Sequence, residues 1–212
     1  SLEARKDRGN RTAARILLVP MASRDIRRRS VTAAALYGGT AAGILGTLIA
    51  VRVLGPEQFG LFTLALATAS FVGLLLDTTI EEAIVKYGFR YSASGDWGRL
   101  RGLFRAGLAI KWGGGAIATL VVLALVPFAD SLFGQPDLTA PLIVAAFIPL
   151  AQAPEGIAGA SMIVAGRYDL RALFGGLAMV MRLVGVAVGV RYGVTWAVVG
   201  ILLGQIAGSC AS

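Results

Sequence analysis

The stretch Arg52-Val-Leu-Gly-Pro-Glu-Gln-Phe-Gly60 lies between two long apolar segments of the chain. Each segment approaches the roughly 20 residues that a helix needs to cross about 30 Å of hydrocarbon. Gly55 and Pro56 break the first predicted helix, and Gly60 opens the second. Because the link is too short to hold a domain, the sequence predicts a tight transmembrane hairpin.

The composition indicates that the solvent of this chain is a bilayer. Hydrophobic residues make up 56% of the 212 residues and charged residues only 15%, against about 25% in soluble domains. The mean hydropathy is +0.74. In lipid the backbone must satisfy its own hydrogen bonds, so the sequence predicts an all-α integral membrane protein that crosses the bilayer several times.

Histidine and cysteine, on which many enzymes and metal sites depend, are nearly missing from the sequence. It has no histidine and a single cysteine, Cys210, which excludes Cys–His nucleophiles, histidine bases, structural zinc and a disulfide within the chain. No GxxxxGK[ST] phosphate-binding loop occurs. We therefore expect no cofactor, no metal site and no enzymatic activity.

The basic residues cluster beside the apolar segments. Of the 20 lysines and arginines, nine precede Ser30 and six lie between Lys86 and Lys111. Such clusters mark cytoplasmic loops under the positive-inside rule. The sequence therefore predicts a protein of the cytoplasmic (inner) membrane with its N-terminus in the cytoplasm and with lipids as partners. No basic helix carries interleaved aromatic residues, so nucleic acid is not an expected partner.

Six membrane spans are predicted, and together they form one transmembrane lobe over residues 21–212. The second span is expected to continue as a cytoplasmic helix to about Tyr87. The fourth is expected to be kinked or partly unwound near Glu155, because Pro149 and Pro154 precede it. The six spans are about 31–52, 60–80, 104–127, 141–163, 172–190 and 194–211.

Residues 1–20 form a separate basic leader whose only apolar run is Ile16-Leu-Leu-Val19. This run is shorter than the core of a signal peptide, which has about 7–15 residues. Met21 begins a segment that leads directly into the first span. The leader is therefore either an upstream extension from a misplaced start or a disordered tail on anionic lipid.

Glycines spaced four residues apart predict that several helices pack closely. Small residues at this spacing let membrane helices approach each other backbone to backbone. The three stripes are Gly39 and Gly43; Gly185, Gly189 and Gly193; and Gly200, Gly204 and Gly208.

The first hairpin resembles the N-terminus of polysaccharide flippases in the multidrug/oligosaccharidyl-lipid/polysaccharide (MOP) exporter superfamily. The resemblance lies in the Leu54-Gly-Pro-Glu-Gln-Phe-Gly60 link and in the later Asp77-Thr-Thr-Ile-Glu-Glu-Ala-Ile-Val-Lys-Tyr87, and it extends over about 30–212. It implies the N-terminal six-helix lobe of a two-lobed transporter whose C-terminal lobe is absent from this chain. A six-helix protein that pairs with a second copy is the alternative.

Ionisable residues inside the spans are the main candidate functional residues, since each costs about 2.5–3.5 kcal/mol at the bilayer centre on insertion scales. Arg182, in the middle of the fifth span, could bind a pyrophosphate as a cavity-facing cation or form a structural ion pair. Glu155 could pair with Arg182 or bind a coupling cation. Asp77 could pair with a cavity arginine, bind a coupling proton or sodium ion, or kink or cap its helix.

Lys111, Arg105 and Gln152 complete the predicted site. Lys111 lies about two turns inside the third span and is expected to turn back to the cytoplasmic interface. With Arg105 it could form a basic mouth for an anionic head group, or the cluster could serve only as a topology signal that contacts anionic lipid. Gln152 could contact sugar hydroxyls, and Glu82 is expected to pair with Lys86 four residues later.

The resemblance implies a flippase that moves a polyprenyl-pyrophosphate-linked oligosaccharide to the outer leaflet by alternating access, for cell-surface polysaccharide biosynthesis. A cation-coupled multidrug exporter of the MATE type is the alternative, although Arg182 and a basic mouth would repel cationic drugs. A membrane-embedded glycosyltransferase would need clustered acids, and the outer loops carry only Glu57, Asp130 and Asp137. A purely structural membrane protein would tolerate loss of Arg182.

Overall fold

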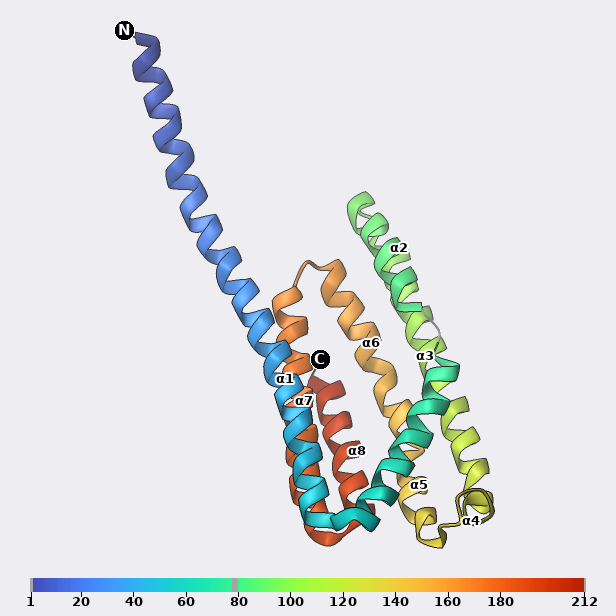
Figure 1. Ribbon diagram of the computed structural model, residues 1–212. Coiled ribbons are helices and arrows are strands. Elements are labelled where there is room, and N and C mark those ends of the chain that lie inside the picture. The colour runs from blue at the N-terminus through green and yellow to red at the C-terminus, as the bar shows by residue number, and fades with distance from the viewer. Residues whose placement is uncertain (1, 78–79, 212) are drawn as a thin grey trace.

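The computed structural model describes residues 2–77 and 80–211, which form helices joined by short turns, with no strand among them (Figure 1). The predicted all-α class is confirmed. The elements are α1 (Leu2–Leu76), α2 (Ile80–Ser94), α3 (Trp97–Leu125), η1 (Val126–Phe128), α4 (Ala129–Phe133), η2 (Pro136–Leu138), α5 (Thr139–Ala145), α6 (Ile148–Val164), α7 (Tyr168–Gly189), η3 (Val190–Tyr192) and α8 (Val194–Ala211).

The element α1 consists of two helical limbs that meet at Gly55, where the chain turns back (Figure 1). Gly55 has φ 74° and ψ 172°, a conformation that is essentially restricted to glycine. Pro56 then occupies the first turn of the second limb, where a missing N–H costs nothing. The predicted turn is confirmed, but the predicted link of nine residues is too long. Gly60 lies inside the second limb and not at its start.

The second limb of α1 ends at Leu76 and α2 begins at Ile80, so the predicted continuous helix to Tyr87 is wrong. The Asp77 N–H bonds to the Leu74 carbonyl at 3.3 Å, a three-residue step that tightens the final turn. Aspartate and β-branched residues have low helix propensity, which favours a break at this point. The helix α2 is therefore free to pack separately against α3 and α6.

The fourth predicted span is also broken, but at a different place from the one expected. The helix α5 ends at Ala145 and α6 begins at Ile148, whereas Pro154 and Glu155 lie inside α6. Pro149 stands in the first turn of α6, and in a continuous helix its ring would clash with the carbonyl of Ala145. The partial unwinding predicted near Glu155 is therefore wrong, while a kink there stays a prediction. Pro149 accounts for the break between α5 and α6.

Four stretches of the described chain are long and apolar enough to cross a membrane. One of them, Ala33–Leu76, contains the end of the first limb of α1 and the whole second limb, and α8 is a shorter apolar helix. The chain is thus a multi-pass membrane protein, while the number of six separate spans stays a prediction. The other three stretches are Trp97–Phe133, Pro136–Val164 and Tyr168–Tyr192.

Two hydrophobic cores hold the bundle together. The larger core joins both limbs of α1 to α3, α5, α7 and α8, and it includes Leu54, Val122 and Val198. These residues lie toward the Gly55 turn. A smaller core, centred on Ile84 and Ile157, joins α2 to α6.

Glycines bring α7 and α8 into backbone contact. A Cβ on Gly185 or on Gly200 would overlap the backbone carbonyl of the other residue. A Cβ on Gly204 would lie 2.7 Å from the Arg182 Cα. The predicted close packing is confirmed for these two helices, whereas Gly43 on α1 has open space around its Cβ position.

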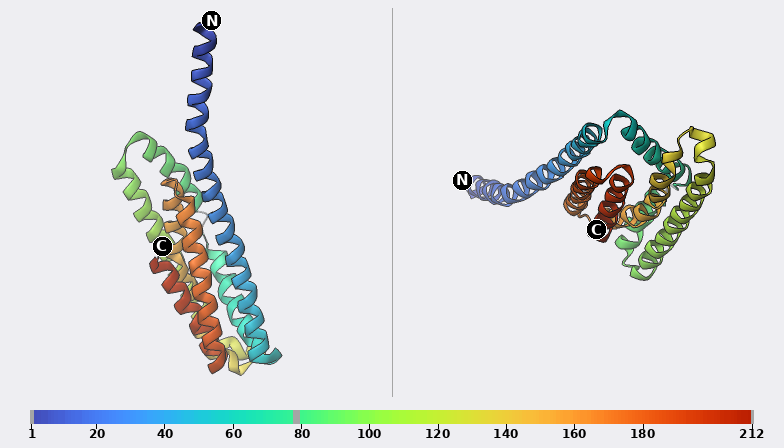
Figure 2. Two further views of the ribbon diagram at one scale, coloured as in Figure 1. Left: turned by 90° about the vertical axis from the view of Figure 1, so that its left-hand side faces the viewer. Right: turned by 90° about the horizontal axis from the view of Figure 1, so that it is seen from below.

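The bundle has two ends with different connections (Figures 1 and 2). The α2–α3 and α6–α7 turns lie at one end, called here the α2–α3 end; Gly55, the segment 126–138 and η3 lie at the other. The first limb of α1 projects beyond the bundle at the α2–α3 end (Figure 2) and is helical from Leu2, where the sequence favours a disordered leader or a misplaced start. The side chains of residues 1–29 lie outside the described part of the chain, so their contacts with lipid stay a prediction.

Candidate functional site

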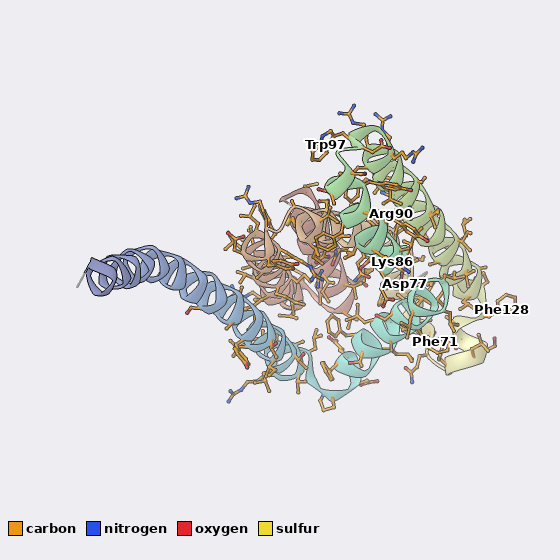
Figure 3. The ribbon with its side chains drawn as sticks, turned by 90° about the horizontal axis from the view of Figure 1, so that it is seen from above. Phe71, Asp77, Lys86, Arg90, Trp97 and Phe128 are labelled. Atoms are coloured by element: carbon orange, nitrogen blue, oxygen red, sulfur yellow. The ribbon has the colours of Figure 1, made fainter. Side chains whose placement is uncertain are left out.

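A cavity of about 780 Å³ occupies the half of the bundle toward the α2–α3 end. Both limbs of α1 line it, together with α2, α3, α6, α7 and the last turns of α8. Figure 3 looks onto this end and places Asp77 where α1 meets α2, while Phe128 lies at the periphery. The polar and charged lining residues are Thr40, Ser70, Asp77, Glu81, Lys111, Gln152, Glu155, Tyr168 and Arg171.

Lys111 of α3 is held by two carboxylates inside this cavity. Its Nζ lies 2.9 Å from Glu81 Oε1 and closer still to Asp77 Oδ1. The Lys111 side chain is only 12% exposed. The expected return of Lys111 to the cytoplasmic interface is therefore wrong, because the two carboxylates satisfy its charge within the bundle. Asp77 does pair with a cavity cation, as one of its interpretations predicts, but the cation is a lysine.

The helix α6 packs against the Asp77–Glu81–Lys111 cluster through a glycine. A Cβ at Gly156 would overlap the Glu81 carboxylate and lie 2.7 Å from its Cδ. A Cβ at Gly115 of α3 would lie 3.1 Å from the Pro149 carbonyl oxygen. Glycine at position 156 thus leaves room for the Glu81 carboxylate as it lies here, and glycine at position 115 allows the close contact between α3 and α6.

We expect Lys111→Ala to destabilise the protein by about 1–2 kcal/mol, because Asp77 and Glu81 would face each other without a cation. Thermal unfolding of the purified protein in detergent measures this effect. Lys86→Ala is the control, since Lys86 is exposed on α2. Adding Glu81→Gln to Lys111→Ala should restore part of the loss. An equal effect of Lys86→Ala, or no recovery in the double variant, contradicts this account of the cluster.

Arg182 and Glu155 form an ion pair between α7 and α6, as one interpretation of the sequence predicts. The Arg182 Nη2 lies 2.9 Å from Glu155 Oε2. The same oxygen accepts a hydrogen bond from Gln205 Nε2 of α8 at 2.6 Å. In addition, Ser209 of α8 donates to the Ala151 carbonyl of α6 at 2.8 Å. These contacts tie α6, α7 and α8 together at the depth of the cavity.

Arg182 does not line the large cavity, although its partner Glu155 does. It borders a second cavity of about 170 Å³ between α1, α7 and α8. Gln205 is completely buried, and its Oε1 and the Arg182 Nε have no hydrogen-bond partner among the described residues. This position favours the structural ion pair over the interpretation of Arg182 as a free cavity cation.

The remaining sequence candidates are divided between the cavity and the surface. Gln152 lines the large cavity, whereas Arg105 is exposed on α3 and does not line it. Lys86 forms no ion pair with Glu82 in the described part of the chain. Its ammonium instead lies 5.9 Å from the centroid of the Tyr87 ring.

Two charged cavity residues, Glu81 and Arg171, are not among the site residues that the sequence predicts. Glu81 follows Asp77 by four residues, and this spacing could have indicated a shared lysine partner. Arg171 was assigned to a loop because the fifth span was expected to begin at residue 172. The helix α7 begins at Tyr168, which places Arg171 in its first turn and on the cavity wall.

The described part of the chain is thus a membrane protein whose apolar helices surround a cavity with charged lining residues. The chain belongs to the polysaccharide biosynthesis protein family, whose model matches residues 28–212. No curated protein matches the chain. Two crystal structures of MATE share its fold, one of a mutant with a TM-score of 0.68 and one in the straight conformation with a TM-score of 0.69.

Each of these two MATE structures is 15% identical to the chain and covers 84% of it. The chain spans only 41% of the length of those transporters. MATE transporters and the matched family both lie within the MOP superfamily, so the resemblance of the first hairpin is confirmed at the level of family and superfamily.

Proposed function

We propose that the protein flips a polyprenyl-pyrophosphate-linked oligosaccharide from the cytoplasmic to the outer leaflet, with this chain acting as the N-terminal lobe. The observation that carries the proposal is a cavity of about 780 Å³, with charged and polar residues in its lining, in a member of the polysaccharide biosynthesis protein family. This volume lies within the range of about 300–1,000 Å³ that ligand sites usually have. Carboxylates, amides and hydroxyls are suitable hydrogen-bonding partners for sugar hydroxyls.

The proposed roles follow the positions of the residues. Gln152 and the carboxylates around Lys111 contact the glycan, and Arg105 lies on the approach at the α2–α3 end. That end faces the cytoplasm, because the basic residues of α2 and of the start of α3 gather there. A coupling proton or cation acts at Asp77 or Glu155, where its arrival would weaken an ion pair. The second lobe, or a second copy, completes the transport path.

A multidrug exporter is the second candidate, and one observation favours it. Three carboxylates line the cavity, from Asp77, Glu81 and Glu155. Cationic drugs would be attracted to such a wall if the paired cations moved aside. The described ion pairs oppose this, since Lys111 and Arg182 neutralise much of that charge.

A flipping assay on the complete protein in proteoliposomes tests the proposal. The exposure of a labelled polyprenyl-pyrophosphate oligosaccharide to an outside-only probe is followed in time. We expect flipping by the wild type and a loss of at least about tenfold in Gln152→Trp, because the indole would fill part of the cavity. Gln135→Trp, at an exposed turn at the Gly55 end, is the matched control. Movement of a cationic dye in place of the glycolipid would favour the exporter.

A further inference from the structure

Among the described side chains, three cationic ones lie in or beside the large cavity, and two of them are neutralised by carboxylates. Lys111 is held by two carboxylates and Arg182 by one. Arg171 lines the cavity, is exposed, and forms no ion pair with any described residue. Its charge is therefore available to a ligand, whereas the use of either other cation would leave a carboxylate unpaired in the bundle.

Arg171 lies against α6 at Gly159, where the helix carries no side chain. A Cβ on Gly159 would lie 3.2 Å from the Arg171 Nε, so the guanidinium passes close to the α6 backbone. Tyr168 precedes Arg171 by three residues on α7, and both line the cavity. The three residues together form a small basic and aromatic corner of the cavity.

We propose that this corner is the subsite for the phosphate or pyrophosphate group of the transported lipid. The inference rests on the proposed function and identifies the part of the cavity that binds the phosphate or pyrophosphate group. An arginine fork can bind two phosphate oxygens at once, and a tyrosine hydroxyl can donate a further hydrogen bond. Arg171 thus takes the role for which the sequence suggests Arg182.

The distribution of charge orients the ligand within the cavity. Gly156, which faces Glu81, and Gly159, which faces Arg171, are three residues apart on α6, or about 4.5 Å along the helix axis. Glu81 and Arg171 therefore lie over neighbouring positions of α6, at one wall of the cavity. The Asp77–Glu81–Lys111 cluster carries a net negative charge and repels a phosphate. The anion is directed to α7, and the sugar attached to it lies over the acidic side.

Binding of farnesyl pyrophosphate to the complete protein in detergent tests the subsite, with farnesol as the ligand without an anion. We expect Arg171→Ala to weaken binding of farnesyl pyrophosphate by about tenfold or more and to leave the weak binding of farnesol unchanged. The affinity of Arg171→Lys for farnesyl pyrophosphate should lie between those of the wild type and Arg171→Ala, since lysine keeps the charge but cannot form two parallel hydrogen bonds. Arg167→Ala is the matched control, because Arg167 is exposed four residues earlier and does not line the cavity.

A second variant keeps the test independent of the arginine itself. Gly159→Leu should displace the Arg171 guanidinium and reproduce the loss of binding, while thermal unfolding confirms that each variant is folded. If the wild type binds farnesyl pyrophosphate more tightly than inorganic pyrophosphate, the ligand of the subsite is a lipid head group. If it binds the two equally tightly, the assignment to a lipid head group is overturned. If the wild type binds and Arg171→Ala binds equally well, the subsite is overturned while the flippase proposal stands. If the wild type does not bind farnesyl pyrophosphate at all, both fail.

Discussion

Gly200→Leu is expected to prevent α7 and α8 from packing and to lower the free energy of unfolding by at least about 3 kcal/mol. A Cβ on Gly200 already overlaps the Gly185 backbone carbonyl, and backbone atoms cannot rotate away as a flexible side chain can. The two helices would have to separate along their whole length. Glu155 could then no longer bind Arg182 of α7 and Gln205 of α8 at the same time.

Thermal unfolding and the yield of monodisperse protein measure the effect of this substitution. Gly113→Leu is the matched control, because Gly113 lies on the exposed side of α3 with open space around its Cβ position. We expect the control to change stability by less than about 0.5 kcal/mol. Similar unfolding temperatures for the two variants would show that α7 and α8 do not meet as described.

Glu155→Ala is expected to lower the free energy of unfolding by about 2 kcal/mol and to reduce flipping. Removing this carboxylate leaves Arg182 without its ion-pair partner and removes the shorter of the two hydrogen bonds that Gln205 Nε2 donates. Breaking fully buried pairs costs about 3–5 kcal/mol. The side chains of Arg182 and Glu155 are 21% and 33% exposed, so we expect a smaller effect.

A double-mutant cycle separates the ion pair from other effects of the substitution. Glu155→Ala/Arg182→Ala should be more stable than the sum of the two single changes predicts, with a coupling of about 1 kcal/mol or more. Glu57→Ala, an exposed acid near the Gly55 turn, is the control for loss of a carboxylate. Strict additivity would mean that the pair contributes nothing to the fold.

The hairpin at Gly55 and the packing of α7 on α8 could be predicted from the sequence, because glycine and proline act locally and the spacing of four residues recurs on each helix. The Arg182–Glu155 ion pair could also be predicted, since two opposite charges at mid-membrane depth need partners. The break at Asp77 was not, because no glycine or proline marks it and the flanking segments are both helical.

The partners of Lys111 and the position of Arg171 could not be predicted from the sequence alone. Sequence spacing relates residues on one helix, whereas Lys111 pairs with Glu81 across two helices. Which cations are neutralised depends on these pairings between helices. A span boundary only a few residues in error was enough to place Arg171 in a loop and not on the cavity wall.

The central claim is that the cavity of this chain holds an anionic glycolipid, and ligand protection of a cysteine in the cavity tests it most directly. Cys210 is replaced by serine, and Gln152→Cys or Ala93→Cys supplies the reporter in the complete protein. Gln152 lines the cavity, and Ala93 is exposed near the end of α2 and outside it. We predict that a polyprenyl-pyrophosphate oligosaccharide slows thiol labelling of Gln152→Cys several-fold and leaves Ala93→Cys unchanged. Equal labelling of Gln152→Cys with and without the glycolipid would contradict the account.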